Sequence, residues 1–389
     1  MPLLRPIALL FAASVAVLPL SPVASAATPG AVTSHSYTVT GGLTRTYLEY
    51  VPAGPAHAGR PVVMFLHGCN QTAEHAMAAT QFNALADQRD FVAVYPQQLV
   101  VPGGGEPLGD GNGIGCWNWF LPKDQRRGSG EPAVLAGISQ AVVADQQADP
   151  NRVYVEGISA GADMSVILAA TYPDVFAAAG SLAGCAYSTC GDLTGELTHT
   201  AMGAAARVVP MFVENGTADT LNPFPQSEGL VQSWLGADDL TDDGAANGSV
   251  ARKPATTSET LPPDAPKPGS GDACIHNNTW TCPGGIAGLS NYPYTVDTYA
   301  VGTDRDALEL WLIYGMEHAQ PHSPATAPNQ GGPYTDPLGP DITTASYDFF
   351  LKHPMPTPTA AVPEVPYAVV LPLVGLLIVG LIARYRRTS

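Results

Sequence analysis

A serine between two glycines is the residue whose surroundings point most directly to chemistry. The segment Gly157-Ile-Ser159-Ala-Gly161 follows a strand-like run at 152–156 and starts a helix-like run at 160–172. Glycines on both sides allow a turn too tight for side chains, and such a strained turn lifts the serine hydroxyl clear of a sheet. The pattern is weak by itself, but its place between a strand and a helix predicts that Ser159 is a nucleophile rather than part of an ordinary turn.

A serine hydroxyl needs a histidine to take its proton and a carboxylate to hold that histidine in the correct tautomer. After a strand–serine–helix turn, the expected chain order is serine, acid, histidine. Of the nine histidines, His318 follows a late predicted strand at 308–314, where a loop at the strand end would reach Ser159. His322 is the alternative base. His67 precedes the serine and is expected in the oxyanion loop instead.

The acid is expected between the serine and the histidine. Asp219 lies there, in a loop that follows a predicted strand at 208–213. Glu214 is nearer to the strand and is one alternative. Asp163 is the other, although its place inside the helix after the serine predicts a side chain that faces solvent. The sequence therefore favours Asp219 as the third member of the triad.

Ester hydrolysis also needs donors for the oxygen that gains charge in the transition state, and losing one donor typically costs about 10² to 10³ in rate. The backbone N–H of Ala160 is one candidate. The other is expected from the loop after the first central strand, where the N–H of Cys69 fits best and Asn70 is expected to contact substrate. Trp117 and Trp119 either line an apolar acyl pocket or belong to the core, and the sequence leaves both interpretations open.

The rest of the middle of the chain alternates strand-like and helix-like runs, as parallel βα units do. An opening hairpin is expected at 37–51, around Gly41-Gly42. Short apolar runs predict strands buried on both faces, and apolar residues at helical spacing predict helices between them. This order predicts an α/β fold with a doubly wound, mostly parallel sheet and helices on both faces. The expected strands are 61–66, 91–95, 152–156, 176–182, 208–213 and 308–314, and the expected helices are 73–88, 131–147, 160–172 and 344–351.

Between about residues 236 and 291 this alternation fails, because Asp, Gly, Pro, Ser and Thr dominate the segment. A loop of this length is uncommon inside a compact domain. We expect an insertion over the strand ends, which is either a functional loop or a solvated one without a catalytic role.

Both ends of the chain carry features of targeting segments. An early Arg5, an apolar run and a small-residue end at Ala24-Ser-Ala26 are typical of a secretory signal peptide. Near the other end, an uncharged apolar segment is just long enough to cross a bilayer at about 1.5 Å per residue, and the arginines after it favour a cytoplasmic end. A sorting signal removed after export and a buried helix are the alternatives for this segment. The expected organisation is a signal peptide (1–26), an esterase domain (27–352), a Pro/Thr-rich linker (353–366), a transmembrane segment (367–383) and a basic cytoplasmic tail (384–389).

Composition limits the partners. Lys and Arg number 17 against 34 Asp and Glu, which gives a net charge of −17. Such an acidic surface repels nucleic acid and anionic polymers and favours neutral substrates. The six cysteines of an exported chain are expected to form disulfides, because the compartment is oxidising and no Cys/His set has zinc spacing. Short separations suggest two local bridges and leave one longer one, so the expected pairs are Cys185–Cys190, Cys274–Cys282 and Cys69–Cys116.

Five motifs in order resemble the poly(3-hydroxybutyrate) depolymerase family of esterases, which is related to feruloyl and acetylxylan esterases. The resemblance runs from about residue 36 to 351, and its motifs are HGCNQT at 67–72, CWNWF at 116–120, RGSGEP at 127–132, RVYVEGISAG at 152–161 and YPDVF at 172–176. It implies an α/β-hydrolase fold, the same triad, and an oxyanion donor in the turn from His67 to Cys69. The family's histidine motif ends in Ala-Trp, whereas Ala319 is followed here by Gln320, so an aromatic wall beside the histidine is expected to be missing. The 236–291 segment is also longer than the family's usual connection.

We therefore expect a secreted or surface-anchored serine esterase that works through an acyl-enzyme, with a hydroxyalkanoate polyester or its oligomers as the first-choice substrate. Release of feruloyl or acetyl groups from plant polysaccharide is the alternative within the same chemistry, because both reactions need the same triad. A surface binding protein on an unused hydrolase scaffold is the alternative from another class. No cofactor or metal is implied.

Overall fold

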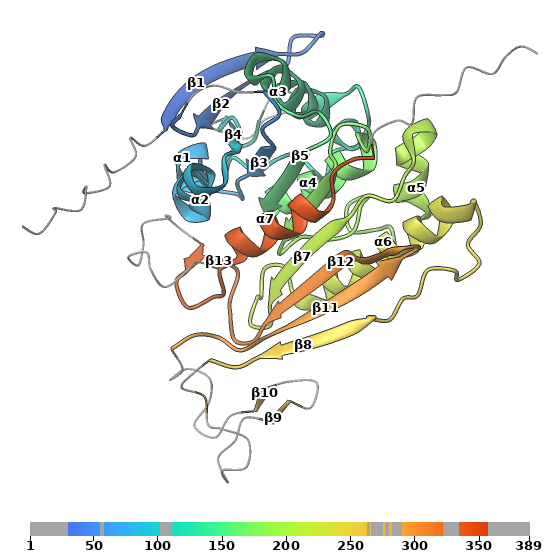
Figure 1. Ribbon diagram of the computed structural model, residues 1–389. Coiled ribbons are helices and arrows are strands. Elements are labelled where there is room, and N and C mark those ends of the chain that lie inside the picture. The colour runs from blue at the N-terminus through green and yellow to red at the C-terminus, as the bar shows by residue number, and fades with distance from the viewer. Residues whose placement is uncertain are drawn as a thin grey trace, which may run out of the picture.

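The computed structural model describes residues 30–54, 58–101, 111–262, 265, 275–276, 280–281, 290–321 and 334–356. Most of these residues form a ten-stranded sheet and the helices that cover it (Figure 1). The expected signal peptide, the apolar segment at 367–383 and His322 lie outside the described residues. Within the described ranges, no helix combines the length and the apolar character needed to cross a membrane.

The bounds of the elements are as follows. The strands of the large sheet are β1 Ala31–Thr38, β2 Thr44–Val51, β3 Val62–Leu66, β4 Val92–Gln97, β5 Val153–Ile158, β6 Ala178–Leu182, β7 Met211–Gly216, β8 Thr256–Thr260, β11 Tyr294–Val301 and β12 Asp304–Ile313. Two small two-stranded sheets are formed by β9 Ile275–His276 with β10 Trp280–Thr281, and by β13 Gln320–Pro321 with β14 Thr335–Asp336. The helices are α1 Ala73–Thr80, α2 Phe82–Arg89, α3 Gly130–Gln146, α4 Ala160–Thr171, α5 Glu196–Met202, α6 Phe224–Asp243 and α7 Ile342–Lys352, with 3₁₀ turns η1 Pro122–Gln125 and η2 Gly203–Ala205.

The strand order confirms the predicted fold class. Neighbouring strands follow the order β1-β2-β4-β3-β5-β6-β7-β12-β11-β8. The central strands from β4 to β12 are parallel, and antiparallel pairs flank them on both sides. The expected opening hairpin is β1 with β2. Because the carboxyl ends of parallel strands meet at one edge of a sheet, the loops after β3, β5, β7 and β12 gather there.

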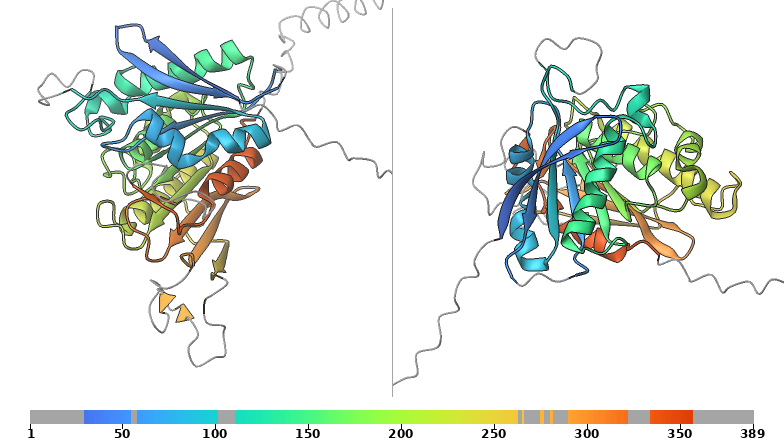
Figure 2. Two further views of the ribbon diagram at one scale, coloured as in Figure 1. Left: turned by 90° about the vertical axis from the view of Figure 1, so that its left-hand side faces the viewer. Right: turned by 90° about the horizontal axis from the view of Figure 1, so that it is seen from above.

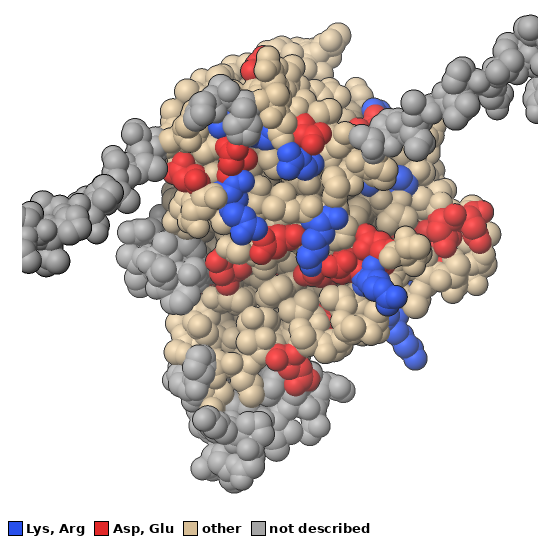
Figure 3. All heavy atoms as spheres, viewed as in Figure 1, with Lys and Arg blue, Asp and Glu red and all other residues tan. Residues whose placement is uncertain are grey.

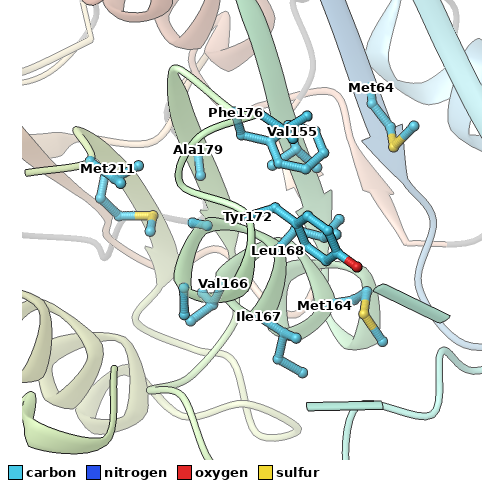
Figure 4. Close-up of a cluster of buried hydrophobic side chains, with 14 of the residues drawn as sticks. Met64, Val155, Met164, Val166, Ile167, Leu168, Tyr172, Phe176, Ala179 and Met211 are labelled. Carbon is cyan, nitrogen blue, oxygen red and sulfur yellow. The ribbon is translucent and has the colours of Figure 1, made fainter. Parts of the chain in front are cut away.

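Helices cover both faces of the sheet, as predicted (Figure 2). One apolar cluster contains side chains of α3, α4 and α6, and the other contains side chains of α1, α2 and α7. Part of the first cluster is shown in Figure 4, which draws Met64 of β3, Val155 of β5, and Met164 and Leu168 of α4. All residues of β3, β5, β6 and α4 are buried, because a parallel strand between two helix layers has no solvent face. This packing fixes the strand ends that carry the site.

Two regions differ from the sequence expectations. The helix expected at 73–88 is divided into α1 and α2, because Gln81 has a φ of 56° and ends the first helix. The segment expected to lack structure from 236 begins inside α6, which continues to Asp243, and β8 then pairs with β11 at the sheet edge. The end of α6 and the strand β8 are rich in polar residues, and that composition hid them. Of the rest of the segment, the structure describes residues 244–255 and a few residues after β8.

Candidate active site

A sharp turn between β5 and α4 carries Ser159. Its backbone has φ 58° and ψ −126°, a conformation that residues other than glycine rarely adopt. Its glycine neighbours are required, since a Cβ on Gly161 would lie 2.1 Å from the carbonyl oxygen of Leu66, and a Cβ on Gly157 would lie 2.4 Å from that of Gly161. The Ser159 N–H donates to the carbonyl of Leu182 at 2.9 Å. Strain and close packing therefore fix the serine at the carboxyl end of β5.

Asp219 and His318 meet at the ends of two adjacent strands. β7 and β12 are parallel neighbours, and the loop after each strand supplies one residue of the pair. His318 Nδ1 lies 2.7 Å from Asp219 Oδ2, and the Asp219 side chain is fully buried. The other carboxylate oxygen accepts the N–H groups of Leu221 at 2.8 Å and Asn222 at 2.9 Å. Because Nδ1 faces a fixed carboxylate, it carries the ring proton of the neutral imidazole, and Nε2 is left as the proton acceptor.

One cavity of about 260 Å³ joins the serine to this pair. Ser159 and His318 both line it, whereas Asp219 lies behind the imidazole. The other lining residues come from the loop after β3, the end of β5 and two further loops: Gly68, Cys69, Asn70, Gln71, Ile158, Leu221 and Tyr334. A carbonyl group bound in this cavity would meet a hydroxyl, an imidazole and the backbone of the loop after β3.

The loop after β3 packs against the serine. A Cβ on Gly68 would lie 3.2 Å from the Cβ of Ser159, and the Gly68 N–H donates to Gln71 Oε1 at 2.7 Å, which closes the turn. Cys69 lines the cavity from this loop. Ala160 is the first residue of α4, and the N–H groups of a helix's first turn have no partner within the helix and carry the positive end of its dipole. The loop and the helix therefore place backbone donors on both sides of the serine.

His67 supports this loop and does not act on substrate. It is fully buried, and burial lowers the pKa of its imidazole to about 4. Its Nε2 accepts the backbone N–H of Gln98 at 3.1 Å, and Nδ1 lies 2.8 Å from the carbonyl of Gly68. A ring that accepts at Nε2 and faces a carbonyl at Nδ1 is neutral with its proton on Nδ1. His67 is thus part of the loop after β3, and the oxyanion role of that loop stays a prediction.

Comparison with known proteins finds esterases that are similar to this domain. Residues 45–216 match the family model described as Esterase PHB depolymerase. Poly(3-hydroxyalkanoate) depolymerase C of Paucimonas lemoignei is 33% identical over 287 residues, which are 73% of this chain and 60% of that protein. Residues 45–216 are thus similar to the poly(3-hydroxybutyrate) depolymerase family of esterases.

Other similar esterases match shorter parts of the chain. Feruloyl esterase B of Neurospora crassa is 30% identical over 169 residues, which cover 43% of this chain and 50% of that protein. A probable acetylxylan esterase A of Aspergillus fumigatus is 31% identical over 147 residues, 36% of each protein. The chain thus spans between about a third and 60% of the length of these curated relatives. A solved acetyl xylan esterase from Aspergillus awamori has a TM-score of 0.51 at 18% identity over 74% of this chain and 94% of that one, which shows a shared fold.

An aromatic side chain stands beside the histidine although the family's Ala-Trp motif is incomplete. The ring of Tyr334 lies edge-on to that of His318, with 5.8 Å between their centroids and 78° between their planes. β13 and β14 bring it there, since the N–H of Gln320 donates to the Tyr334 carbonyl at 2.8 Å. The expectation of a missing aromatic wall was therefore wrong. Tyr334 and Leu221 were both missed, because no spacing rule connects residues on separate loops to one cavity.

The two tryptophans do not line the cavity. Trp117 is completely buried in the first apolar cluster, and its Nε1–H donates to the carbonyl of His67 at 3.0 Å. Trp119 is half-buried, packs against the same cluster and lies edge-on to Phe120. The sequence left a pocket and the core open for these residues, and the core interpretation agrees with the packing of Trp117. An aromatic-rich segment looks the same in sequence whether it packs on a core or on a ligand. Asn70, by contrast, does line the cavity.

Among the described residues, neither alternative acid is hydrogen-bonded to a histidine. Glu214 is fully buried, and burial raises its carboxyl pKa well above the usual value. Asp163 is also buried, and its Oδ1 accepts the N–H of Cys185 at 2.9 Å. Burial raises the Asp163 pKa to about 7. The expectation that Asp163 faces solvent was wrong, because α4 is covered on all sides by the sheet and neighbouring helices.

Two of the three predicted disulfides are present in the described residues. They join Cys69 to Cys116 and Cys185 to Cys190. The expected partners Cys274 and Cys282 lie outside the described residues. The first bridge ties the oxyanion loop to the segment before Trp117, and the second closes a turn after β6.

One group of described side chains has the spacing of metal ligands. Ligand atoms of Asp304, Asp306 and His353 lie within 4.8 Å of one another. Their charges already have partners, since Lys352 Nζ lies 2.9 Å from Asp306 and His353 Nε2 lies 3.2 Å from Asp304. The group is at the amino-terminal end of β12, whereas His318 follows its carboxyl end. It therefore lies at the opposite end of β12 from the cavity.

Proposed function

We propose that the chain is a serine esterase that hydrolyses carboxylic esters through an acyl-enzyme, with Ser159, His318 and Asp219 as its triad. The observation that supports this most is the state of His318. Its Nδ1 is bonded to a buried carboxylate at 2.7 Å, while the same ring lines one cavity with the strained serine. Nucleophile, base and orienting acid come from the three strand ends at which this architecture places them.

The proposed reaction has two half-reactions. Ser159 Oγ attacks the ester carbonyl carbon as His318 Nε2 takes its proton, and the imidazolium then protonates the departing alkoxide. Water attacks the acyl-enzyme in the same way, which releases the acid and restores the serine. Asp219 stays ionised and stabilises the imidazolium. The N–H groups of Cys69 and Ala160 donate to the oxyanion, and each contributes about 3 kcal/mol to lowering the barrier.

A hydroxyalkanoate polyester or its oligomers is the proposed first substrate. Support comes from the 33% identity with a poly(3-hydroxyalkanoate) depolymerase over 73% of this chain. A neutral polyester is also compatible with a chain of net charge −17. Feruloyl or acetyl groups on plant polysaccharide are the second candidate, supported by the shorter matches to feruloyl and acetylxylan esterases.

The substrate proposal is tested with purified protein on polyhydroxybutyrate film, methyl ferulate and acetylated xylan. We expect soluble hydroxyacid products from the film, none of them with Ser159→Ala, and lower kcat/KM on the other two substrates. If the protein acted on methyl ferulate or acetylated xylan but not on the film, its substrate would be a feruloyl or acetyl ester and not the polyester.

A binding protein on an unused hydrolase scaffold would behave differently. A fluorophosphonate probe reacts with an activated serine, so the wild-type chain should be labelled and Ser159→Ala should not be. A folded wild-type chain that stays unlabelled would favour the binding protein.

Export and tethering are part of the proposal. The features of residues 1–26 support export, and the disulfides Cys69–Cys116 and Cys185–Cys190 suit an oxidising compartment. Attachment to the membrane is supported by the order of segments after the esterase domain at 27–352: a linker at 353–366, an apolar span at 367–383 and a basic end at 384–389.

The full chain should sediment with membranes, and a chain that ends at residue 352 should appear in the medium. Full chain in the medium with its tail intact by mass spectrometry would contradict the tether.

A further inference from the structure

The motif Gly130-Glu131-Pro132 has no part in the triad, yet it anchors a buried polar cluster behind the oxyanion loop. Glu131 is fully buried in the first turn of α3. The turn that carries it has little freedom: Gly130 has a φ of 56°, and a Cβ there would lie 1.9 Å from Asp124 Oδ1. The Glu131 N–H also donates to Asp124 Oδ1 at 2.7 Å. Pro132 suits the first turn of a helix. The motif therefore holds one carboxylate in a fixed place.

That carboxylate accepts four hydrogen bonds. Oε1 accepts Arg45 Nη2 at 2.9 Å, Asn118 Nδ2 at 3.0 Å and Gln98 Nε2, and Oε2 accepts the backbone N–H of Asn118 at 2.7 Å. The side chains of Arg45 and Glu131 are both completely buried. Hydrogen bonds to a charged group in a low-dielectric interior are strong and directional. The four donors come from β2, from the end of β4 and from the segment after Cys116, and Glu131 joins all three.

Gln98 extends the cluster to the oxyanion loop. Its Nε2 also donates to the carbonyl of Cys116 at 2.8 Å, and its backbone N–H donates to His67 Nε2 at 3.1 Å. Asn112 Nδ2 donates to the same Cys116 carbonyl at 2.6 Å. Asn112 Nδ2 also donates to Asn118 Oδ1 at 2.9 Å. The position of Cys116 is therefore set by Gln98, which is bonded to Glu131, and by Asn112, which is linked to Glu131 through Asn118.

Cys116 in turn is bonded to Cys69, whose N–H is the proposed second oxyanion donor. The next residue, Asn70, donates its N–H to the carbonyl of Ile114 at 2.8 Å. Cys69 and Asn70 both line the cavity. The disulfide and the hydrogen bond therefore fix one wall of the cavity relative to the 112–118 segment.

We propose that Glu131 is a positioning residue for the oxyanion hole. Through Gln98 and the Cys69–Cys116 bridge, it holds the Cys69 N–H where the oxyanion forms, and it touches no substrate itself. This inference rests on the proposed ester hydrolysis.

The test compares two variants of the cluster with a matched control. Glu131→Gln removes the charge, and Gln98→Met removes the side-chain link to Cys116 while it keeps the Arg45–Glu131 pair. Glu49→Gln is the control, because Glu49 is also buried and bonded to α3, through Gln146 Nε2 at 2.6 Å. Its bonds run to the far end of that helix. Each full-length variant is assayed on a p-nitrophenyl ester and on the matching thionoester, at a temperature where circular dichroism shows it folded.

A well-placed oxyanion hole prefers oxygen, because sulfur is larger and a weaker acceptor, so the ester-to-thionoester ratio of kcat/KM reports on the hole. Loss of one donor costs about 10² to 10³ in rate, and displacement of one should lower kcat about 10- to 100-fold with KM nearly unchanged. We expect this fall, and a smaller ratio, for both cluster variants but not for Glu49→Gln. Folded cluster variants with wild-type kcat and ratio would overturn the inference. A wild-type chain inactive on both esters would instead overturn the proposed function, and the inference with it.

Discussion

At the scale of single residues, the orientation of His318 depends on groups on both sides of its ring. Asp219 bonds Nδ1, and its own carboxylate is held by the N–H groups of Leu221 and Asn222. Tyr334 meets the ring edge-on. Bonding at Nδ1 leaves Nε2 as the other ring nitrogen, and both His318 and Ser159 line the cavity. Transfer of the serine proton to Nε2 is part of the proposed mechanism.

Asp219→Asn should lower kcat by about 10⁴ with little change in KM. An amide at this position donates to Nδ1 and favours the wrong imidazole tautomer. Steady-state kinetics on a soluble ester measures the effect. The matched control is Glu214→Gln, since Glu214 is a buried carboxyl on the adjoining strand that a neutral amide can replace. If Asp219→Asn were fully active and Glu214→Gln inactive, Glu214 and not Asp219 would be the acid of the triad.

Tyr334→Ala should raise KM several-fold for esters with an apolar acyl group, whereas Tyr334→Phe should not. The ring lines the cavity and stays 38% exposed, so apolar substrate atoms can cover it. Burying about 40 Å² of apolar surface is worth about 1 kcal/mol, which corresponds to about a fivefold change in KM. Equal KM values for all three proteins would show that the ring contacts no substrate.

At the scale of elements, buried acidic groups lie between α7 and the sheet. Ser346 of α7 donates to Glu156 Oε2 of β5 at 3.1 Å, and burial raises the Glu156 pKa to about 8. The helix thus packs on a carboxyl group that is neutral at pH 7. Because the folded state binds this proton up to about pH 8 and the unfolded chain loses it near pH 4.5, stability contributed by the neutral form is complete at low pH and is lost as pH rises through that window.

Glu156→Gln should therefore become more stable relative to wild type as pH rises from 5 to 8. One proton bound only in the folded state gives a slope of at most about 1.4 kcal/mol per pH unit. The melting temperatures of both proteins, measured at each pH, should diverge in favour of the variant. An exposed control, Glu228→Gln, should follow wild type. If the difference in melting temperature between Glu156→Gln and wild type did not change with pH, the Glu156 carboxyl would be ionised in the folded protein.

Which elements were predictable depended on their burial. β3, β5 and β6 are apolar runs buried on both faces, and α3 and α4 have apolar residues at helical spacing, so periodicity found them. β8 has only exposed residues, so it lacks the alternation of buried and exposed positions that would distinguish it from a loop. Its neighbour β11 is rich in β-branched and aromatic residues, a strand signal that the prediction did not use. Strand pairing at the sheet margin is a tertiary effect, and propensity is a weak guide to it.

The candidate site was predictable where strand order fixes it and unpredictable where packing does. Ser159, Asp219 and His318 each follow a recognisable strand, so their loops meet at one edge. Trp117 lies in the core, and Tyr334, which the sequence did not single out, lines the cavity. The burial of an aromatic side chain depends on distant parts of the chain, so the sequence could not assign these places.

At the scale of the whole molecule, negative charge dominates. The chain carries 34 acidic residues against 17 basic ones. On the face in Figure 3, basic side chains lie beside acidic ones in a band, and pairs such as Arg127–Asp174 at 2.6 Å and Lys352–Asp306 at 2.9 Å neutralise part of the excess. The negative charge that is not neutralised acts at long range on charged molecules and has little effect on neutral ones.

Salt should therefore separate substrates by charge. For a neutral p-nitrophenyl ester, kcat/KM should change less than about twofold between low and high NaCl, whereas for a hemisuccinate ester it should rise several-fold as salt screens the repulsion. Initial rates at constant pH measure both. The same salt response for both esters would mean that the field of the chain does not reach the cavity.

The central claim concerns the hydroxyl of Ser159, the imidazole of His318 and the two backbone donors, and the structure of an organophosphate adduct tests all of them at once. After reaction with diethyl p-nitrophenyl phosphate, we expect phosphorus bonded to Ser159 Oγ. Its phosphoryl oxygen should lie about 3 Å from the nitrogens of Cys69 and Ala160, and His318 Nε2 should face the serine oxygen. Phosphorus on another residue, or a phosphoryl oxygen turned away from both N–H groups, would contradict the account.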